Sequence, residues 1–166
     1  MKDKPVNQKG ITLVELVIAI GISSFVIVGA AVAIFQLITV SDRNSNYMTA
    51  YTEVQNAGFS VSRDATQAQA VDDTSGFVTL DWVDWEGDAH KVVYTLEDAS
   101  DGLKELWRTY SINDVPQETM RVARYIDPVT NLAWNASENV LTLVITAQVG
   151  DQTATRTYNV KPRPLS

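Results

Sequence analysis

The sequence predicts an α+β protein in which one long N-terminal helix packs on an antiparallel β-sheet. Residues 16–35 carry no charged side chain and no proline, which is typical of a helix in lipid. Between Tyr47 and Ala68, the residues suited to a buried face recur at spacings of three and four, as on an amphipathic helix. From Phe77 onward, short segments rich in β-branched and aromatic residues are separated by turn residues, which indicates strands.

The apolar run predicts a membrane-spanning helix over residues 11–40. At a rise of 1.5 Å per residue, twenty residues cover about 30 Å, the thickness of the hydrocarbon core. Residues 1–10 hold three lysines and one aspartate, so the positive-inside rule places them in the cytoplasm and the C-terminal domain outside the cytoplasmic (inner) membrane. A plain signal anchor is the alternative. A cleaved secretory signal fits less well, because the run is longer than a signal core.

Residues 41–71 are predicted to continue this helix out of the membrane and into the globular domain. The expected buried face consists of Tyr47, Tyr51, Val54, Gly58, Val61, Ala65 and Ala68. Two helices broken near Ser41 or Gly58 remain an alternative, because glycine lowers helix propensity.

Residues 72–166 are predicted to form an antiparallel β domain. The expected strands are 77–83, 90–96, 103–110, 120–126, 140–149 and 153–160, with an irregular piece around Asp127, Pro128 and Trp134. The last two are joined by the turn Gly150-Asp151-Gln152 and form the clearest hairpin. The tail from Lys161 to Pro164 cannot pair as a central strand and is expected to end the fold.

Charge and cysteine content exclude several functions. Residues 41–166 hold 10 basic and 18 acidic side chains, so non-specific binding of nucleic acid is not expected. The chain has no cysteine, which excludes thiol catalysis and thiolate metal sites.

Little in the β domain indicates catalysis, so neither enzymatic activity nor a cofactor is expected. The single histidine, His90, is expected to be a solvated turn residue. A weak candidate for a hard-cation site is the acidic group Asp81, Asp84, Glu86 and Asp88, which departs from the EF-hand pattern; a solvated acidic hairpin is the favoured interpretation. The four tryptophans are expected mostly to fill the core, with Trp85 the most exposed.

The N-terminus carries a family resemblance. Lys9-Gly10-Ile11-Thr12-Leu13-Val14-Glu15-Leu16, ahead of the apolar run, resembles the signature of type IV prepilins and of the pseudopilins of type II secretion. The first mature residue is Ile here, where the family usually has Phe. The resemblance implies a pilin-like fold, a leader over residues 1–10, cleavage between Gly10 and Ile11 by a prepilin peptidase, and N-methylation of Ile11.

The same resemblance implies a role for Glu15. A carboxylate among apolar residues needs a partner, and none of the residues from Ile11 to Val40 is basic. The implied partner is the terminal amine of a neighbouring subunit, created by the cleavage. Other implied partners are pilin or pseudopilin subunits that pack through the N-terminal helix, and an inner-membrane assembly platform.

Two further fragments resemble J-type minor pseudopilins and related minor pilins. One is Ser62-Arg63-Asp64-Ala65. The other is a strand, a turn and a strand: Val92-Val93-Tyr94-Thr95-Leu96, then Gly102-Leu103 and Leu106-Trp107-Arg108. The expected function is therefore a structural subunit, minor rather than major, of a type IV pilus or a type II secretion pseudopilus. The competing interpretation is a single-pass membrane-anchored extracytoplasmic binding or sensor domain. The sequence does not choose between pilus and secretion system.

Overall fold

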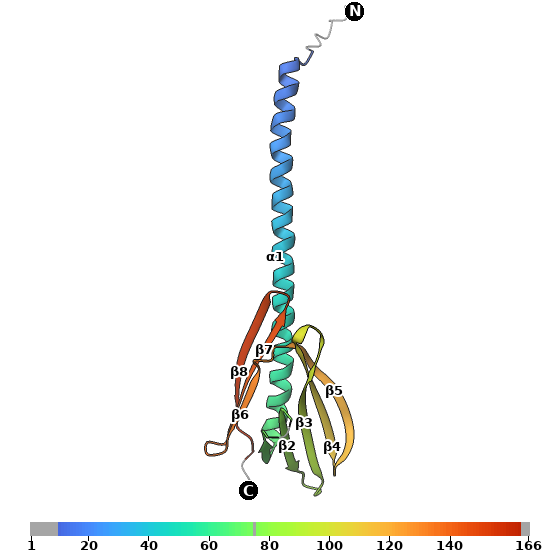
Figure 1. The fold of residues 1–166 in the computed structure, drawn as a ribbon, viewed down its shortest axis with the longest axis vertical. Coiled ribbons are helices and arrows are strands. Elements are labelled where there is room, and N and C mark those ends of the chain that lie inside the picture. Colours follow the sequence, from blue (N-terminus) through green and yellow to red (C-terminus); the bar gives the residue numbers. More distant parts are fainter. Residues whose placement is uncertain (1–9, 75, 164–166) are drawn as a thin grey trace, which may run out of the picture. The chain divides into compact units, whose positions relative to one another are not determined.

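The computed structural model describes residues 10–74 and 76–163 and confirms the α+β class. One long helix, α1 (Leu13–Gln67), packs against an eight-stranded antiparallel sheet (Figure 1). The chain divides into two compact units, Met1–Asp42 and Arg43–Ser166, and α1 contributes to both.

Helix α1 runs without a break through Ser41 and Gly58, so the alternative of two separate helices is wrong. It ends at Gln67, four residues before the predicted end at residue 71, and the next residues form strand β1 (Ala70–Asp72). The side chain of Gln69 explains the early end. Its amide accepts from the Val83 N–H at 3.1 Å and donates to the Val83 carbonyl at 3.4 Å, which draws the chain onto the sheet.

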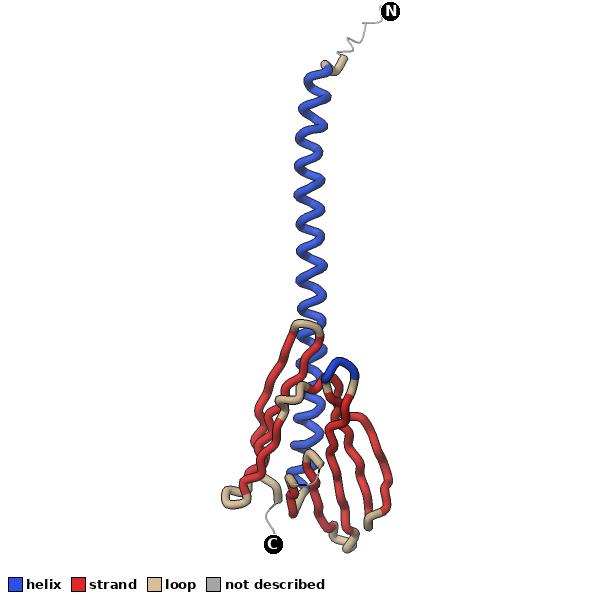
Figure 2. The backbone as a smooth tube through the Cα atoms, in the orientation of Figure 1, coloured by secondary structure: helices blue, strands red, loops and turns tan. Residues whose placement is uncertain are grey.

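The remaining strands are β2 (Val78–Val83), β3 (Ala89–Asp98), β4 (Lys104–Ile112), β5 (Val115–Ile126), β6 (Asn131–Asn135), β7 (Val140–Val149) and β8 (Gln152–Val160). The order along the sheet is β1-β2-β3-β4-β5-β7-β6, and β8 pairs with the other side of β7. Strands β5 and β7 share a single residue pair, Ile126 with Ala147. Figure 2 shows β2 to β5 on one side of the second half of α1 and β6 to β8 on the other.

The hydrophobic core lies between α1 and the sheet in the unit Arg43–Ser166. The predicted helix face is confirmed for Val54, Gly58, Val61, Ala65 and Ala68, whereas Tyr47 remains 44% exposed. Fully buried sheet residues opposite include Leu80, Tyr94, Leu106, Leu141, Leu143 and Ile145. Small residues on the helix let its backbone approach the strands closely, as close packing requires.

Gly58 lies where α1 packs against Tyr158 of β8. A Cβ atom added there would lie 2.1 Å from the Tyr158 ring, a distance that no pair of carbon atoms tolerates. The Tyr158 hydroxyl donates to the Val54 carbonyl at 3.4 Å. A side chain at position 58 would therefore force the Tyr158 ring to move, which favours glycine here despite its cost of about 1 kcal/mol relative to alanine in a helix.

Candidate functional site

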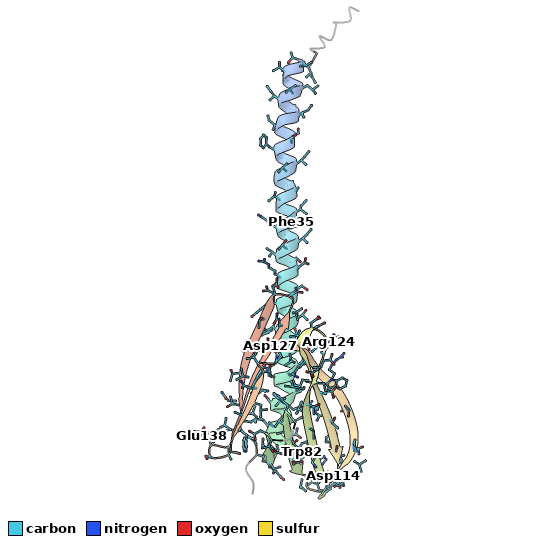
Figure 3. All side chains as sticks on the ribbon, in the orientation of Figure 1. Phe35, Trp82, Asp114, Arg124, Asp127 and Glu138 are labelled. Atoms are coloured by element: carbon cyan, nitrogen blue, oxygen red, sulfur yellow. The ribbon has the colours of Figure 1, made fainter. Side chains whose placement is uncertain are left out.

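The first half of α1 presents apolar side chains to its surroundings. The large hydrophobic residues from Ile11 to Val40 are between 52% and 83% exposed. Phe35, at 72%, is an example (Figure 3). Among the described residues, α1 is the one helix long and apolar enough to cross a membrane. An apolar surface of this size is stable in lipid or against other apolar helices, and not in water.

The hydroxyl groups within the apolar run are satisfied by the helix itself. Ser23 donates to the Ala19 carbonyl at 2.7 Å, and Ser24 donates to the Ile20 carbonyl at 2.8 Å. These bonds remove the cost of placing an unpaired hydroxyl in hydrocarbon. The segment therefore suits a membrane despite its two serines.

Glu15 takes part in a capping box at the start of α1. Its Oε2 atom accepts from the Thr12 backbone N–H at 2.9 Å and from the Thr12 hydroxyl at 3.0 Å. In return, the Glu15 backbone N–H donates to the Thr12 hydroxyl at 3.2 Å. Sequence reasoning missed this role of Thr12, although the Thr-x-x-Glu spacing before an apolar run is a known signal for it. The capping box satisfies hydrogen bonds, but no cation in it neutralises the carboxylate.

Gly10 and Ile11 lie just ahead of the helix and form no regular secondary structure. Both residues are exposed. A Cβ atom on Gly10 would meet no other atom within 4 Å, so packing in the described part of the chain does not require glycine at this position. The leader residues 1–9 lie outside the described residues.

His90 is not the solvated turn residue that the sequence predicts. It lies in β3, opposite Trp82, and its side chain is only 13% exposed. One ring nitrogen, Nδ1, lies 2.7 Å from the Tyr110 hydroxyl, and Nε2 lies 3.0 Å from Asp84 Oδ2. The ring also stacks on the Trp82 indole at a centroid distance of 5.2 Å. The prediction failed because the partners of His90 come from three segments: Trp82 from β2, Asp84 from the turn after it and Tyr110 from β4.

Three of the four acidic candidates come together in the turn between β2 and β3. Asp84, Glu86 and Asp88 each place one carboxylate oxygen within 4.8 Å of the others, whereas Asp81 lies on β2, opposite Lys91. Asp84 is already engaged, because Oδ1 accepts from the backbone N–H groups of Glu86 and Asp88, and Oδ2 bonds His90. The His90 bond holds the pKa of the Asp84 carboxyl below its ordinary value. Asp84 thus organises the turn.

The tryptophans divide between the core and the surface. Trp82 and Trp134 pack partly buried against the core, and Trp85 is 91% exposed, as predicted. Trp107 departs from the prediction: it lies outside the core cluster, with the Arg121 guanidinium 5.9 Å from its ring centroid.

A buried ion pair between Asp64 and Arg108 links α1 to the sheet. Sequence reasoning assigned no role to this pair. The side chains of Asp64 and Arg108 are 4% and 9% exposed, and Arg108 Nε donates to Asp64 Oδ2 at 2.6 Å. The Tyr94 hydroxyl donates to the same oxygen at 2.7 Å. Burial, together with the Asp64 charge, raises the pKa of Tyr94 well above its ordinary value, so the hydroxyl stays a donor. All three residues belong to the fragments that resemble minor pseudopilins.

Comparison with known proteins identifies the N-terminal segment. Residues 6–31 match the family model for the prokaryotic N-terminal methylation motif. No curated protein and no solved structure matches the chain. The matched residues cover the predicted cleavage position, the capping box and most of the exposed apolar run of α1. The chain therefore carries the signature of type IV pilins and pseudopilins at its N-terminus.

Proposed function

We propose that the protein is a non-enzymatic structural subunit, of the minor class, of a type IV pilus or type II secretion pseudopilus. Prepilin peptidase cuts it between Gly10 and Ile11, Ile11 is N-methylated, and the N-terminal helix then packs with other subunits. The observation that carries the proposal is the methylation motif at residues 6–31, placed at the start of a helix whose apolar side chains are exposed.

The charges of the chain suggest how the subunit is inserted in the membrane and then assembled. The basic leader stays in the cytoplasm while residues 11–40 span the inner membrane and the C-terminal domain lies outside. After cleavage, the new amine of Ile11 supplies a cation, and Glu15 of a neighbouring subunit supplies the carboxylate. Pairing them removes an uncompensated charge from lipid, so the helix is more stable in an assembly than alone. The subunit then leaves the membrane for the filament, through the inner-membrane assembly platform.

Minor status is supported by two features. The fragments that resemble J-type minor pseudopilins meet at the buried Asp64, which gives those fragments a common structural role. The chain also lacks the cysteines with which many major pilins close a C-terminal loop. Abundance in sheared filaments tests this assignment, because a minor subunit is present at a small fraction of the major one.

The intact mass of the membrane-extracted protein tests the maturation step. The expected mature chain begins at methylated Ile11, and Gly10→Leu should retain residues 1–10. Gly10→Leu suits the test, since a Cβ atom at this position meets no other described atom within 4 Å. Gly21→Leu is a matched control, because Gly21 also has open space around it and lies outside the cleavage position. A wild-type chain that keeps residues 1–10 beside an active prepilin peptidase would instead indicate an anchored binding or sensor domain.

A further inference from the structure

The turn between β2 and β3 exposes the largest apolar side chain on the domain surface. Trp85 is 91% exposed, more than any other large hydrophobic residue in ranges 10–74 and 76–163. Val83 beside it is 48% exposed. A single exposed apolar residue is ordinary, but a tryptophan and a valine at the mouth of a recess are typical of an interaction surface.

Two adjoining recesses surround these side chains at the end of the domain where α1 ends. Their volumes are about 300 and about 560 Å³, and both are lined by Gln69, Trp82 and Val83. The first also includes His90 and Asp114, and the second includes Trp85. Figure 3 shows Trp82 and Asp114 toward the same end of the domain. Recesses of this size accept one or two side chains of a partner.

The surface is held in place before any partner arrives. The Asp84 backbone N–H donates to the Asp88 carbonyl at 3.1 Å, and the Asp84 side chain bonds two further backbone N–H groups of the turn. Asn113 in the neighbouring β4–β5 turn donates to Asp88 at 2.9 Å and accepts from the Ala89 N–H at 2.9 Å. Binding of a partner therefore loses little conformational entropy in this loop, which favours affinity.

The charges around the recesses favour a cationic partner. Five carboxylates surround them, Asp81, Asp84, Glu86, Asp88 and Asp114, against two bases, Lys91 and Arg163. Lys91 is already paired with Asp114 at 2.9 Å. Within the described part of the chain, Glu86 and Asp88 form no ion pair, so their charges are available. An exposed indole beside them adds a site for a cation on its face.

A second copy of this chain is a poor source of that cation. The opposite end of the domain contains the β7–β8 turn, which lies beside Asn46 and includes Asp151. The nearby loop between β3 and β4 contributes Asp98 and Asp101. Two bases lie beside it: Lys104, which is paired with Asp98, and Arg124, which lines one recess together with Asp101 and Glu105. That end is therefore not basic.

We infer that the recess around Trp82, Val83 and Trp85 binds a protein segment in which lysine or arginine alternates with apolar residues. The apolar residues fill the recess and contact Trp85, and the basic residues lie against Glu86 and Asp88. The partner is a protein other than this chain, and the contact does not involve the N-terminal helix. The acidic residues determine which partner fits, while the aromatic recess provides the binding surface.

Fluorine NMR of the full chain in zwitterionic detergent tests this inference. The four tryptophans are labelled as 5-fluorotryptophan, and their signals are assigned with Trp→Phe variants. The probe is a synthetic peptide of alternating arginine and leucine, titrated beside an alternating glutamate and leucine peptide and a chitin oligosaccharide. We expect the basic peptide alone to shift the signals of Trp82 and Trp85, and leave those of Trp107 and Trp134 in place.

Matched variants separate specific binding from general charge attraction. Glu86→Gln with Asp88→Asn should weaken the basic peptide at least tenfold, as should Trp85→Ala, the size of effect expected of a central interface residue. Asp101→Asn with Glu138→Gln removes the same number of charges from exposed positions elsewhere and should leave the affinity unchanged. Circular dichroism verifies that each variant remains folded.

Several results would overturn the inference. One is a shift of all four tryptophan signals together, and another is equal weakening by both charge-removing pairs. A response to the oligosaccharide without one to the basic peptide would identify a carbohydrate site instead. Trp85→Ala should leave cleavage after Gly10 unchanged, so a loss of cleavage would bear on the proposed function and not on this contact.

Discussion

Glu15 carries a charge within an otherwise apolar segment. A carboxylate near the start of an apolar helix is unfavourable in lipid unless it is paired. The capping box with Thr12 satisfies one oxygen through two hydrogen bonds. It leaves the charge without a cation, so a hydrogen-bonding role and an ion-pairing role can be separated by substitution.

We expect Glu15→Gln and Glu15→Ala both to lower incorporation into filaments by at least tenfold, without affecting cleavage after Gly10. Glutamine keeps an acceptor for Thr12 but lacks the charge, so equal defects would show that the charge is what matters. The measurement is the amount of subunit in sheared filaments relative to the membrane pool. Ser24→Ala is the control and should incorporate normally, because its hydroxyl bonds only its own helix. Wild-type incorporation of Glu15→Ala would contradict the proposed ion pair.

Asp84 should make the stability of the domain depend on pH in the acidic range. The hydrogen bond from His90 lowers the pKa of Asp84 in the folded state. The stabilisation is therefore present above the ordinary carboxyl pKa, about 3.9, and is lost as the pH falls through the lower folded value. We expect the melting temperature of Asp84→Asn to vary less with pH than that of wild type between about pH 5 and 3.

Thermal unfolding followed by circular dichroism across this pH range provides the measurement. Glu138→Gln serves as the control, since this residue lies in the exposed turn between β6 and β7 and should keep the wild-type pH dependence (Figure 3). Identical pH dependence in Asp84→Asn and wild type would show that the His90 contact does not affect stability.

At the scale of elements, the buried Asp64–Arg108 pair connects α1 to β4. Removing one partner of a buried ion pair typically costs about 3–5 kcal/mol. Arg63 also contacts Asp64 at 3.1 Å, and Glu118 lies 3.8 Å from Arg108, so the remaining charge keeps one partner and the cost should fall at the low end of that range. We expect Asp64→Leu and Arg108→Met each to lower the free energy of unfolding by an amount in that range. The double variant replaces both charges with apolar groups and should lose much less than the sum.

Denaturant unfolding of the four proteins, followed by tryptophan fluorescence, completes this double-mutant cycle. The exposed pair Lys104–Asp98 is the control, and removing Lys104 should cost at most about 1 kcal/mol because water screens the pair. Additive losses at Asp64 and Arg108 would mean that the two side chains act independently, contrary to their 2.6 Å contact.

Sequence periodicity predicted those elements whose pattern extends over many residues. The β7–β8 hairpin was predicted nearly to the residue, because it presents one apolar side over its full length. The buried face of α1 was predicted in part, since Ala50, Ala57 and Asp64 are also buried. The β4–β5 hairpin was missed. Its turn is Asn113-Asp114, where both residues adopt positive φ, and a proline follows at 116. Proline is tolerated there because the outer side of β5 has no neighbouring strand over most of its length.

The remaining misses depend on contacts between distant segments. Strand β1 forms because Gln69 bonds Val83, fourteen residues away, and its three residues carry no strand pattern of their own. Strand β6 is short, with asparagine at both ends, and is held by pairing with β7. The N-terminal site differs, because Gly10, Ile11 and Glu15 lie within one short motif that a family model matches. Their roles in cleavage, methylation and assembly stay predictions.

At the scale of the whole molecule, the two units suit different solvents. The unit Met1–Asp42 shows no buried side chain among its described residues. Every residue of the hydrophobic core lies in Arg43–Ser166. The structure therefore assigns stability in water to the second unit, while the first depends on lipid or on neighbouring helices.

The fragment 43–166 should accordingly fold alone. We expect it to be soluble and monomeric without detergent, and to unfold cooperatively, because it retains the core, the sheet and the Asp64–Arg108 pair. Size-exclusion chromatography with light scattering, and thermal unfolding by circular dichroism, provide the measurements. Full-length protein is the control and should require detergent. Aggregation or a gradual unfolding transition of the fragment would show that the apolar half of α1 contributes to the folded domain, and that its exposed side chains are covered by that domain rather than by lipid or other subunits.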